Sequence, residues 1–188
     1  MSLEHYPHGI FLEAVRKRRP LIHQITNRVI ALISANATLA VGASPIMADH
    51  PEEVDEVASR ADALVLNLGT PQASTLESML IAGRAAQRVG IPVILDPVGV
   101  GFTELRRRAA DAIARAIPLT VIRGNASEIV ALARMSMSPA NGIPLSVESH
   151  GVDSSILDDT FVQSAARQLA DRWQTVVATT GRIDYIAA

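Results

Sequence analysis

Short aliphatic runs alternate with helical segments along almost the whole chain, and this alternation limits the possible folds most. The strand-like runs cover residues 21–26, 43–48, 63–68, 92–95, 119–122 and 175–179, and a further strand can start at 183. Between them lie Ala-rich segments or segments with apolar residues at a spacing of 3.6. Such alternation is typical of parallel strands joined by right-handed helical crossovers. We therefore predict an α/β fold with a mostly parallel sheet and helices on both faces.

Composition agrees with buried parallel strands, because 48% of the residues are hydrophobic and only 3% are aromatic. The 188 residues are enough for one domain, which we place at 1–188. The net charge of −2 gives no reason to expect nucleic acid or a membrane as a partner. Because the chain has no cysteine, disulfides and thiolate catalysis are excluded. No apolar run has transmembrane length and no signal sequence is evident, so we expect a cytoplasmic protein.

The stretch 121–128, with the sequence VIRGNASE, combines a strand, a glycine and a helix start. We expect the chain to turn sharply at Gly124, with Asn125 as the N-cap of a helix and Glu128 at the third position of a capping box. A helix start offers unpaired N–H groups to an anion such as phosphate, and Arg123 adds a forked cation there. A second helix start is expected around residues 49–53, where Pro51 precedes two acids.

Glu128 allows two interpretations. A carboxylate beside an anion site is repulsive unless a metal ion joins the two, so Glu128 can belong to a metal-bound phosphate site. Alternatively, Glu128 only caps the helix and pairs with Arg123. Spacing alone favours the second interpretation.

Polar and small residues gather where the predicted strands end, and ligands of open α/β sheets bind beyond the carboxyl ends of the strands. These positions are Thr26-Asn27, Ser44-Pro45 near Met47, Asn67 to Gly69, Asp96-Pro97, Arg123 to Asn125 and Thr180-Gly181. Asp96 and Glu128 together with Arg123 suit a magnesium-bound phosphate. The pattern points to nucleotide binding or phosphoryl transfer.

Several common motifs are absent from the sequence. It contains neither G-x-G-x-x-G, nor G-x-x-x-x-G-K-[ST], nor H-E-x-x-H. His23 alternates into the first strand, so a buried structural histidine is favoured over a ligand. On general grounds Met47 is more often a core residue than a substrate contact. The irregular segment 136–158 is typical of a lid, a binding loop or a disordered loop.

In their order along the chain, several segments resemble hydroxyethylthiazole kinases of the ribokinase-like superfamily. The segments are ITN at 25–27, ANA at 35–37, GASPIMA at 42–48, LVLNLGT at 64–70, ILDPVG at 94–99, VIRGNASE at 121–128, GVDS at 151–154 and TG at 180–181. Each is weak alone, but together they span nearly the whole chain and are specific.

The resemblance implies ATP- and Mg²⁺-dependent phosphorylation of 4-methyl-5-(2-hydroxyethyl)thiazole in thiamine biosynthesis or salvage. By position, it places Met47 in the thiazole pocket with Asn27 beside it. Arg123 and Thr180 would bind the ATP phosphates, and Asp96 and Glu128 would organise magnesium. It also implies a ribokinase-like three-layer sandwich and a homotrimer with the thiazole pocket at subunit boundaries.

The family continues past the strand at Thr180-Gly181 into a Gly-rich turn that carries the catalytic base, a cysteine in some members. No residues of this chain match that turn, so we expect these 188 residues to lack the base and the C-terminal part of the fold. Arg28 and the segment 136–150 also differ from the family pattern. Two other functions stay open. The chain can be a non-catalytic remnant that binds thiazole or assembles with other subunits, or a kinase of another small alcohol such as a hydroxymethylpyrimidine.

Overall fold

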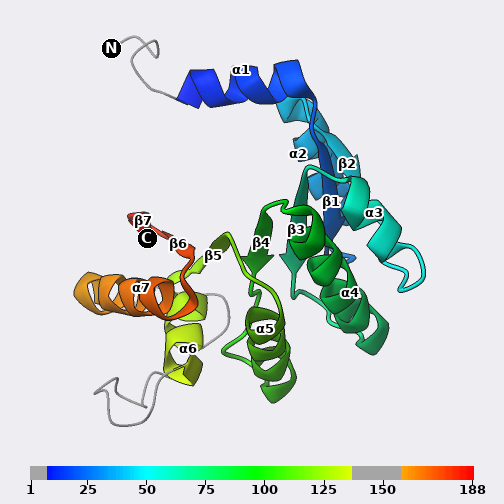
Figure 1. The fold of residues 1–188 in the computed structure, drawn as a ribbon. Helices are drawn as coiled ribbons and strands as arrows, with labels where there is room; N and C mark the ends of the chain where they lie inside the picture. The colour runs from blue at the N-terminus through cyan, green and yellow to red at the C-terminus, as the bar shows by residue number, and fades with distance from the viewer. Residues whose placement is uncertain (1–7, 137–157) are drawn as a thin grey trace.

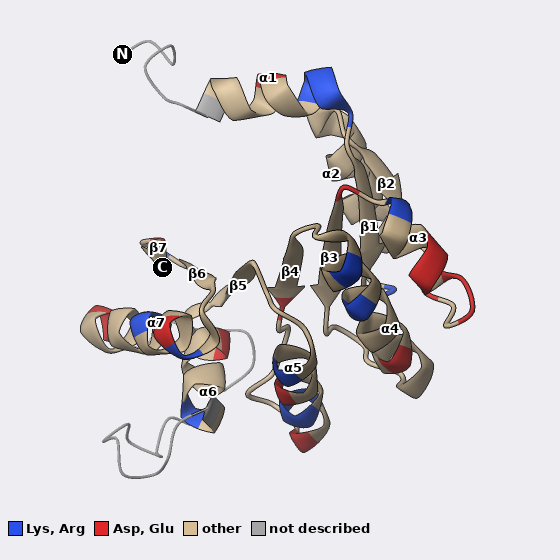
Figure 2. Cartoon of the chain, viewed as in Figure 1, with Lys and Arg blue, Asp and Glu red and all other residues tan. Residues whose placement is uncertain are grey.

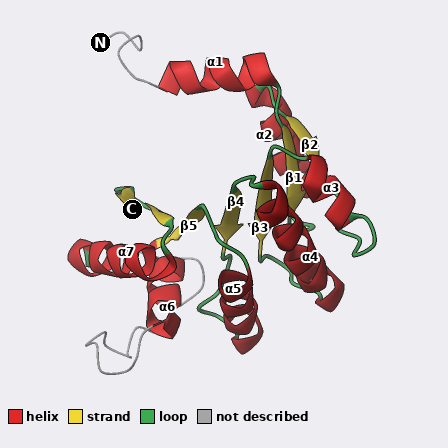
Figure 3. Cartoon of the chain, viewed as in Figure 1, coloured by secondary structure: helices red, strands yellow, loops and turns green. Residues whose placement is uncertain are grey.

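The structure is a computed structural model that describes residues 8–136 and 158–188 (Figure 1). Residues 137–157, which include most of the predicted loop 136–158 and the GVDS segment at 151–154, therefore lie outside the described residues. Helices and strands alternate as the sequence indicates (Figure 3). The helices are α1 (His8–Arg18), α2 (Ala31–Val41), α3 (Val54–Arg60), α4 (Ala73–Val89), α5 (Glu104–Ala116), α6 (Ala126–Ser136) and α7 (Asp159–Trp173).

The described strands form one sheet with the order β2-β1-β3-β4-β5-β6-β7. They are β1 (Leu21–Ile25), β2 (Ser44–Ile46), β3 (Ala63–Asn67), β4 (Val93–Asp96), β5 (Val121–Asn125), β6 (Val176–Thr180) and β7 (Tyr185–Ala187). All neighbouring strands are parallel except β6 and β7, which are antiparallel. The strand order reverses between β1 and β3, since the chain first moves outward to β2 and then returns past β1. Such a reversal creates the crevice in which ligands of open α/β sheets bind.

Helices lie on both faces of the sheet, as predicted. On one face, α2 lies over β1, where Gln24 donates from Nε2 to Thr38 Oγ1 at 2.7 Å. Helices α3 to α7 form a continuous layer against the other face (Figure 1). The main core lies between this layer and the sheet, and it includes the fully buried side chains Leu64, Leu66, Leu95, Ile122 and Leu169. The α/β fold with a mostly parallel sheet is therefore confirmed.

Two local predictions are wrong. Residues 51–53 form turns, and α3 begins only at Val54. Gly124 does not turn the chain, because it lies inside β5 in register with Thr179. The glycine is needed for space instead: a Cβ there would lie 3.1 Å from Glu128 Oε2.

Charged residues of both signs occur in most helices, whereas α2 contains none (Figure 2). Helix α2 is strongly apolar, yet it buries no residue. In the described part of the chain, no helix combines the length and the apolar character that crossing a membrane requires.

Candidate active site

Four polar side chains leave the carboxyl ends of β3 to β6 on the same face of the sheet. Asn67 is in register with Asp96, and Arg123 is in register with Ala178, two residues before Thr180 on the same strand. Ile94 pairs with Val121, which puts Asp96 and Arg123 two residues further along their strands. Residues in register, and residues two apart on one strand, share a face. The predicted residues Asp96, Arg123 and Thr180 are therefore brought together.

Asn27 lies just beyond β1 and is connected to this row through Asn67. The Asn27 side chain is 8% exposed and donates from Nδ2 to Asn67 Oδ1 at 2.9 Å. Asn67 in turn donates from its own Nδ2 to Asp96 Oδ2 at 2.8 Å. These hydrogen bonds cross the reversal of strand order between β1 and β3. They place the predicted substrate residue Asn27 one side chain away from the predicted metal residue Asp96.

The carboxyl group of Asp96 is hard to ionise in this setting. Burial, and next the nearby charge of Glu128, raise its pKa from 3.8 to about 6. Arg123 and the hydrogen bond from Asn67 act in the opposite direction. A cation between Asp96 and Glu128 would therefore relieve repulsion between the two carboxylates.

Glu128, in the first turn of α6, caps that helix as the sequence indicates. Asn125 donates its N–H to Glu128 Oε2 at 2.9 Å, and Asn125 Oδ1 accepts the N–H of Glu128 at 3.0 Å. This is the reciprocal arrangement of a capping box. The other carboxylate oxygen, Oε1, accepts the N–H of Gly99 at 2.9 Å. The expected pairing with Arg123 is not formed: among the described residues, no ion pair within 4.0 Å involves Arg123.

Arg123 is exposed, so its guanidinium is available to a ligand. Thr180 is half-buried, and its Oγ1 donates to the carbonyl of Gly124 at 3.3 Å. This bond uses the only hydroxyl proton, but the oxygen keeps lone pairs that can accept a further hydrogen bond. Both side chains thus stand at the edge of the sheet where an anionic group could reach them.

Met47 follows β2 and is half-buried. In the residue that follows Met47, the carbonyl oxygen of Ala48 lies 2.9 Å from His23 Nε2, and His23 is fully buried. Burial lowers the pKa of His23. His23 is thus a structural residue, as expected, and it supports the segment that carries Met47.

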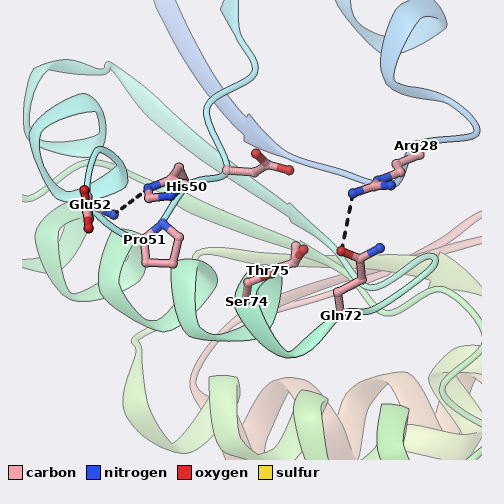
Figure 4. Close-up of a pocket in the computed structure, with 8 residues that line it drawn as sticks. Arg28, His50, Pro51, Glu52, Gln72, Ser74 and Thr75 are labelled. Carbon is pink, nitrogen blue, oxygen red and sulfur yellow. Dashed lines mark hydrogen bonds between the residues drawn. The ribbon is translucent and has the colours of Figure 1, made fainter.

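A hollow of about 460 Å³ lies between the segment after β1, the segment after β2 and the start of α4 (Figure 4). Its lining includes Arg28, which follows Asn27, and Asp49, which lies two residues after Met47. Arg28 Nη2 and Gln72 Oε1 approach across it to 3.4 Å, and Thr75 lines it from the first turn of α4. The lining carries charges of both signs and polar side chains beside apolar surface, so it suits a small polar molecule.

The donor set limits which metal could be held. Across the described residues, no group of three or more His, Cys, Asp or Glu side chains is arranged as a metal site. Two carboxylates fit Mg²⁺, because this ion usually keeps waters and takes further oxygens from substrate phosphates. Both Glu128 oxygens already accept backbone N–H groups, so Asp96 is the carboxylate with more free lone pairs.

The sequence predicts no role for Asn67 or Gly99. Asn67 was recognisable only as a polar residue at a strand end. The contact of the Gly99 N–H with Glu128 had no sequence signal, because it joins the loop after β4 to a helix residue 29 positions further on.

Comparison with known proteins indicates the family of the chain. A model of the hydroxyethylthiazole kinase family matches residues 12–188. The chain belongs to this family. Hydroxyethylthiazole kinase from Listeria monocytogenes serotype 4a is 47% identical over 176 residues, which are 94% of this chain and 61% of that protein. The protein of the same name from Alkaliphilus metalliredigens is 46% identical over 93% of this chain and 60% of its own length. The chain thus spans about three fifths of these relatives.

Solved structures give the same result for the fold. Hydroxyethylthiazole kinase from Pyrococcus horikoshii matches with a TM-score of 0.79 and 37% identity, over 93% of this chain and 61% of that chain. A phosphofructokinase-2 variant from Escherichia coli matches with a TM-score of 0.52 and 13% identity, over 95% of this chain and 63% of that chain. At this low identity the similarity concerns the fold alone. The resemblance read from the motifs, and with it the ribokinase-like fold, is confirmed.

Proposed function

We propose that this protein phosphorylates the primary alcohol of 4-methyl-5-(2-hydroxyethyl)thiazole with ATP, in thiamine biosynthesis or salvage. The observation that carries the proposal is the hydrogen-bonded series Asn27–Asn67–Asp96, which meets Arg123 and Thr180 at one edge of the sheet in a member of this family. It supports an alcohol site near Asn27 and Met47 that lies next to a phosphate site.

In this reaction the alcohol oxygen attacks the γ-phosphorus of ATP in line. A new O–P bond forms while the bond between the γ-phosphorus and the β,γ-bridging oxygen breaks, and ADP leaves. Arg123 is exposed and cationic, so it can bind the transferring phosphate and offset its charge. Thr180 and the N–H groups that open α6 can orient phosphate oxygens. We assign no described residue to the base that takes the alcohol proton.

We assign Mg²⁺, when bound, to Asp96 and Glu128, where it would neutralise phosphate charge. The raised pKa of Asp96 supports a role in binding a cation, since the two carboxylates repel each other without one. Glu128 would contact the ion mainly through bound water, because its own oxygens accept the N–H groups of Gly99 and Asn125.

We also infer that the protein is a homotrimer. Helices α1 and α2 support this, because they expose large apolar side chains: Ile10 (71%), Phe11 (68%), Leu32 (75%), Ile33 (69%) and Leu39 (57%). Exposed large apolar side chains of this kind often mark an interaction site. Helix α2 packs against β2 and is linked to β1 by the hydrogen bond from Gln24 to Thr38. Because Asn27 and Met47 follow these two strands, a neighbouring subunit that contacts α2 could close the alcohol site.

The test is a reaction with ATP and Mg²⁺ in which mass spectrometry measures formation of the phosphate ester. The thiazole alcohol is compared with a hydroxymethylpyrimidine and with a reaction without alcohol. We expect ADP to form with the thiazole alcohol in preference to the other two. Preferential phosphorylation of the pyrimidine would contradict the proposed substrate. If the thiazole alcohol neither binds in calorimetry nor stimulates ADP formation, the proposal fails.

A further inference from the structure

The orientation of both amides in the series Asn27–Asn67–Asp96 is fixed by backbone donors. Asn27 Oδ1 accepts the N–H groups of Val29 and Ile30 at 3.0 and 3.1 Å. Only the amide oxygen can accept them, so Asn27 Nδ2 must be the atom that faces Asn67.

The same reasoning applies to Asn67. Its Oδ1 accepts the N–H of Gly69 at 2.9 Å and the Nδ2 donor of Asn27 at 2.9 Å. Asn67 Nδ2 is therefore directed to Asp96 Oδ2, at 2.8 Å. If either amide rotated by 180°, its own N–H groups would face backbone N–H donors. For Asn67 this would leave the buried N–H of Gly69 unpaired, which is costly. Asn67 itself is only 4% exposed, so water cannot easily replace these partners.

We propose that Asn67 is a positioning residue that couples the alcohol side of the site, at Asn27, to the phosphate side, at Asp96. The inference rests on the proposed function. Asn67 ends β3, which lies between β1, the strand that Asn27 follows, and β4, the strand that ends at Asp96. A shift of Asn27 on binding the alcohol would move the Asn67 amide. The amide in turn determines which lone pairs of Asp96 face the phosphates.

This coupling makes a thermodynamic prediction. If the two half-sites are linked, nucleotide must change the affinity for the alcohol, and the alcohol must change the affinity for nucleotide by the same factor. A purely structural Asn67, which only holds the turn at Gly69, would not carry such a factor.

The discriminating variant is Asn67→Asp. It keeps an acceptor for Gly69 and Asn27, but it replaces the donor to Asp96 by a second acceptor. Thr38→Val is the matched control: it breaks a comparable hydrogen bond, from Gln24 in β1 to α2, that does not lead to Asp96.

Calorimetry measures the affinity of the full 188-residue chain for 4-methyl-5-(2-hydroxyethyl)thiazole, with and without Mg²⁺ and a non-hydrolysable ATP analogue. In the wild type and in Thr38→Val, we expect Mg²⁺ and the ATP analogue to change the alcohol affinity by about fivefold or more. In Asn67→Asp this nucleotide-dependent change in alcohol affinity should fall below about twofold. An unchanged factor in Asn67→Asp overturns the inference.

A ligand-free measurement separates this inference from the proposed function. The side-chain amide signals of Asn27 and Asn67 are followed by ¹⁵N NMR in the wild type and in Asp96→Asn. Removing the charge at Asp96 should move both signals, although Asn27 does not contact Asp96. If the Asn27 signal does not move, the inference is wrong even where the alcohol binds. If it moves but the alcohol does not bind, the connection through Asn67 stands and the proposed function fails.

Discussion

Gly99 donates its backbone N–H to Glu128 Oε1 at 2.9 Å, and this contact fastens the loop after β4 to the start of α6. Gly99 has a φ of +66°, a conformation that most side chains avoid, so a glycine is needed to present this N–H. The second oxygen of Glu128 accepts the N–H of Asn125. One carboxylate therefore holds the loop after β4 and the junction between β5 and α6, which border the phosphate side of the site.

Replacing Glu128 by alanine should lower the free energy of unfolding by about 2 kcal/mol, because the N–H groups of Gly99 and Asn125 both lose their acceptor. Glu128→Gln keeps one acceptor oxygen and should lose about half as much. Urea unfolding without metal or nucleotide measures this. A Glu128→Ala chain as stable as the wild type would mean that the carboxylate serves a ligand and not the fold.

Asp96→Asn should make the chain more stable at pH 7, by about 1–2 kcal/mol. A rise of its pKa from 3.8 to about 6 costs the folded state 1.36 kcal/mol per unit at pH values above both, and partial solvent screening reduces this. The sign follows from proton binding. Between pH 4 and 6 the folded state holds more protons at Asp96 than the unfolded state, so this group's contribution is lost as pH rises through that window.

The measurement is the difference in unfolding free energy between Asp96→Asn and wild type, taken from pH 4 to 7.5. We expect the difference to grow with pH and to level off above about pH 6.5. The asparagine can still accept the hydrogen bond from Asn67, so the comparison isolates the charge. A difference that does not vary with pH would show that burial and Glu128 do not act on this carboxyl as described.

Gly69→Ala should displace Asn27. A Cβ at position 69 would lie 2.5 Å from Asn27 Nδ2, a distance at which one of the two must move. We expect weaker binding of the thiazole alcohol by about tenfold or more, which corresponds to about 1.4 kcal/mol, and lower stability. Gly9→Ala is the control, because nothing lies within 4 Å of a Cβ there. Wild-type affinity in Gly69→Ala would argue against Asn27 as part of the alcohol site.

The fold was predictable from the sequence because the strands are apolar and end in small or polar residues. The capping box of Asn125 and Glu128 was predictable for a similar reason: its two members are three residues apart, and local spacing determines the geometry. The start of α3 was not. Pro51 and the acids after it are typical of a helix start, but the chain forms turns there and Val54 is the first helical residue that is buried.

For the strand ends, the sequence predicts that polar residues gather at one edge of the sheet but not which of them touch. Asn67 contacts Asp96 because β3 and β4 are neighbours in this register, and neither the strand order nor the register can be read from the sequence. The role of Gly124 was misjudged for a related reason. A glycine suggests a turn when only local conformation is considered, whereas here it makes room for Glu128 from the next helix.

His23 should make stability depend on pH in the direction opposite to Asp96. Burial lowers its pKa below 6.5, and its Nδ1 has no hydrogen-bond partner among the described residues, so protonation in the folded state is unfavourable. The unfolded chain binds the proton more readily, so stability falls as pH drops below about 6.5. Glu53 lies near enough to offset part of this effect.

His23→Gln is the variant that tests this, since it removes the titrating group and keeps a donor for the Ala48 carbonyl. We expect wild type to lose stability relative to His23→Gln between pH 6.5 and 5, measured by thermal unfolding. Parallel pH curves for the two proteins would contradict the assignment of a neutral, buried histidine.

The apolar surface of α1 and α2 should be the contact between subunits, so one charge in it should prevent assembly. Leu32 is 75% exposed, and placing a carboxylate at the centre of an apolar interface costs several kcal/mol. We expect sedimentation velocity to show a trimer for the wild type and a monomer for Leu32→Asp, with unchanged circular dichroism. Phe102→Asp is the matched control, because Phe102 is 64% exposed but precedes α5, away from α2. A monomeric wild type would remove the support for the trimer, and a trimeric Leu32→Asp would place the contact on another surface.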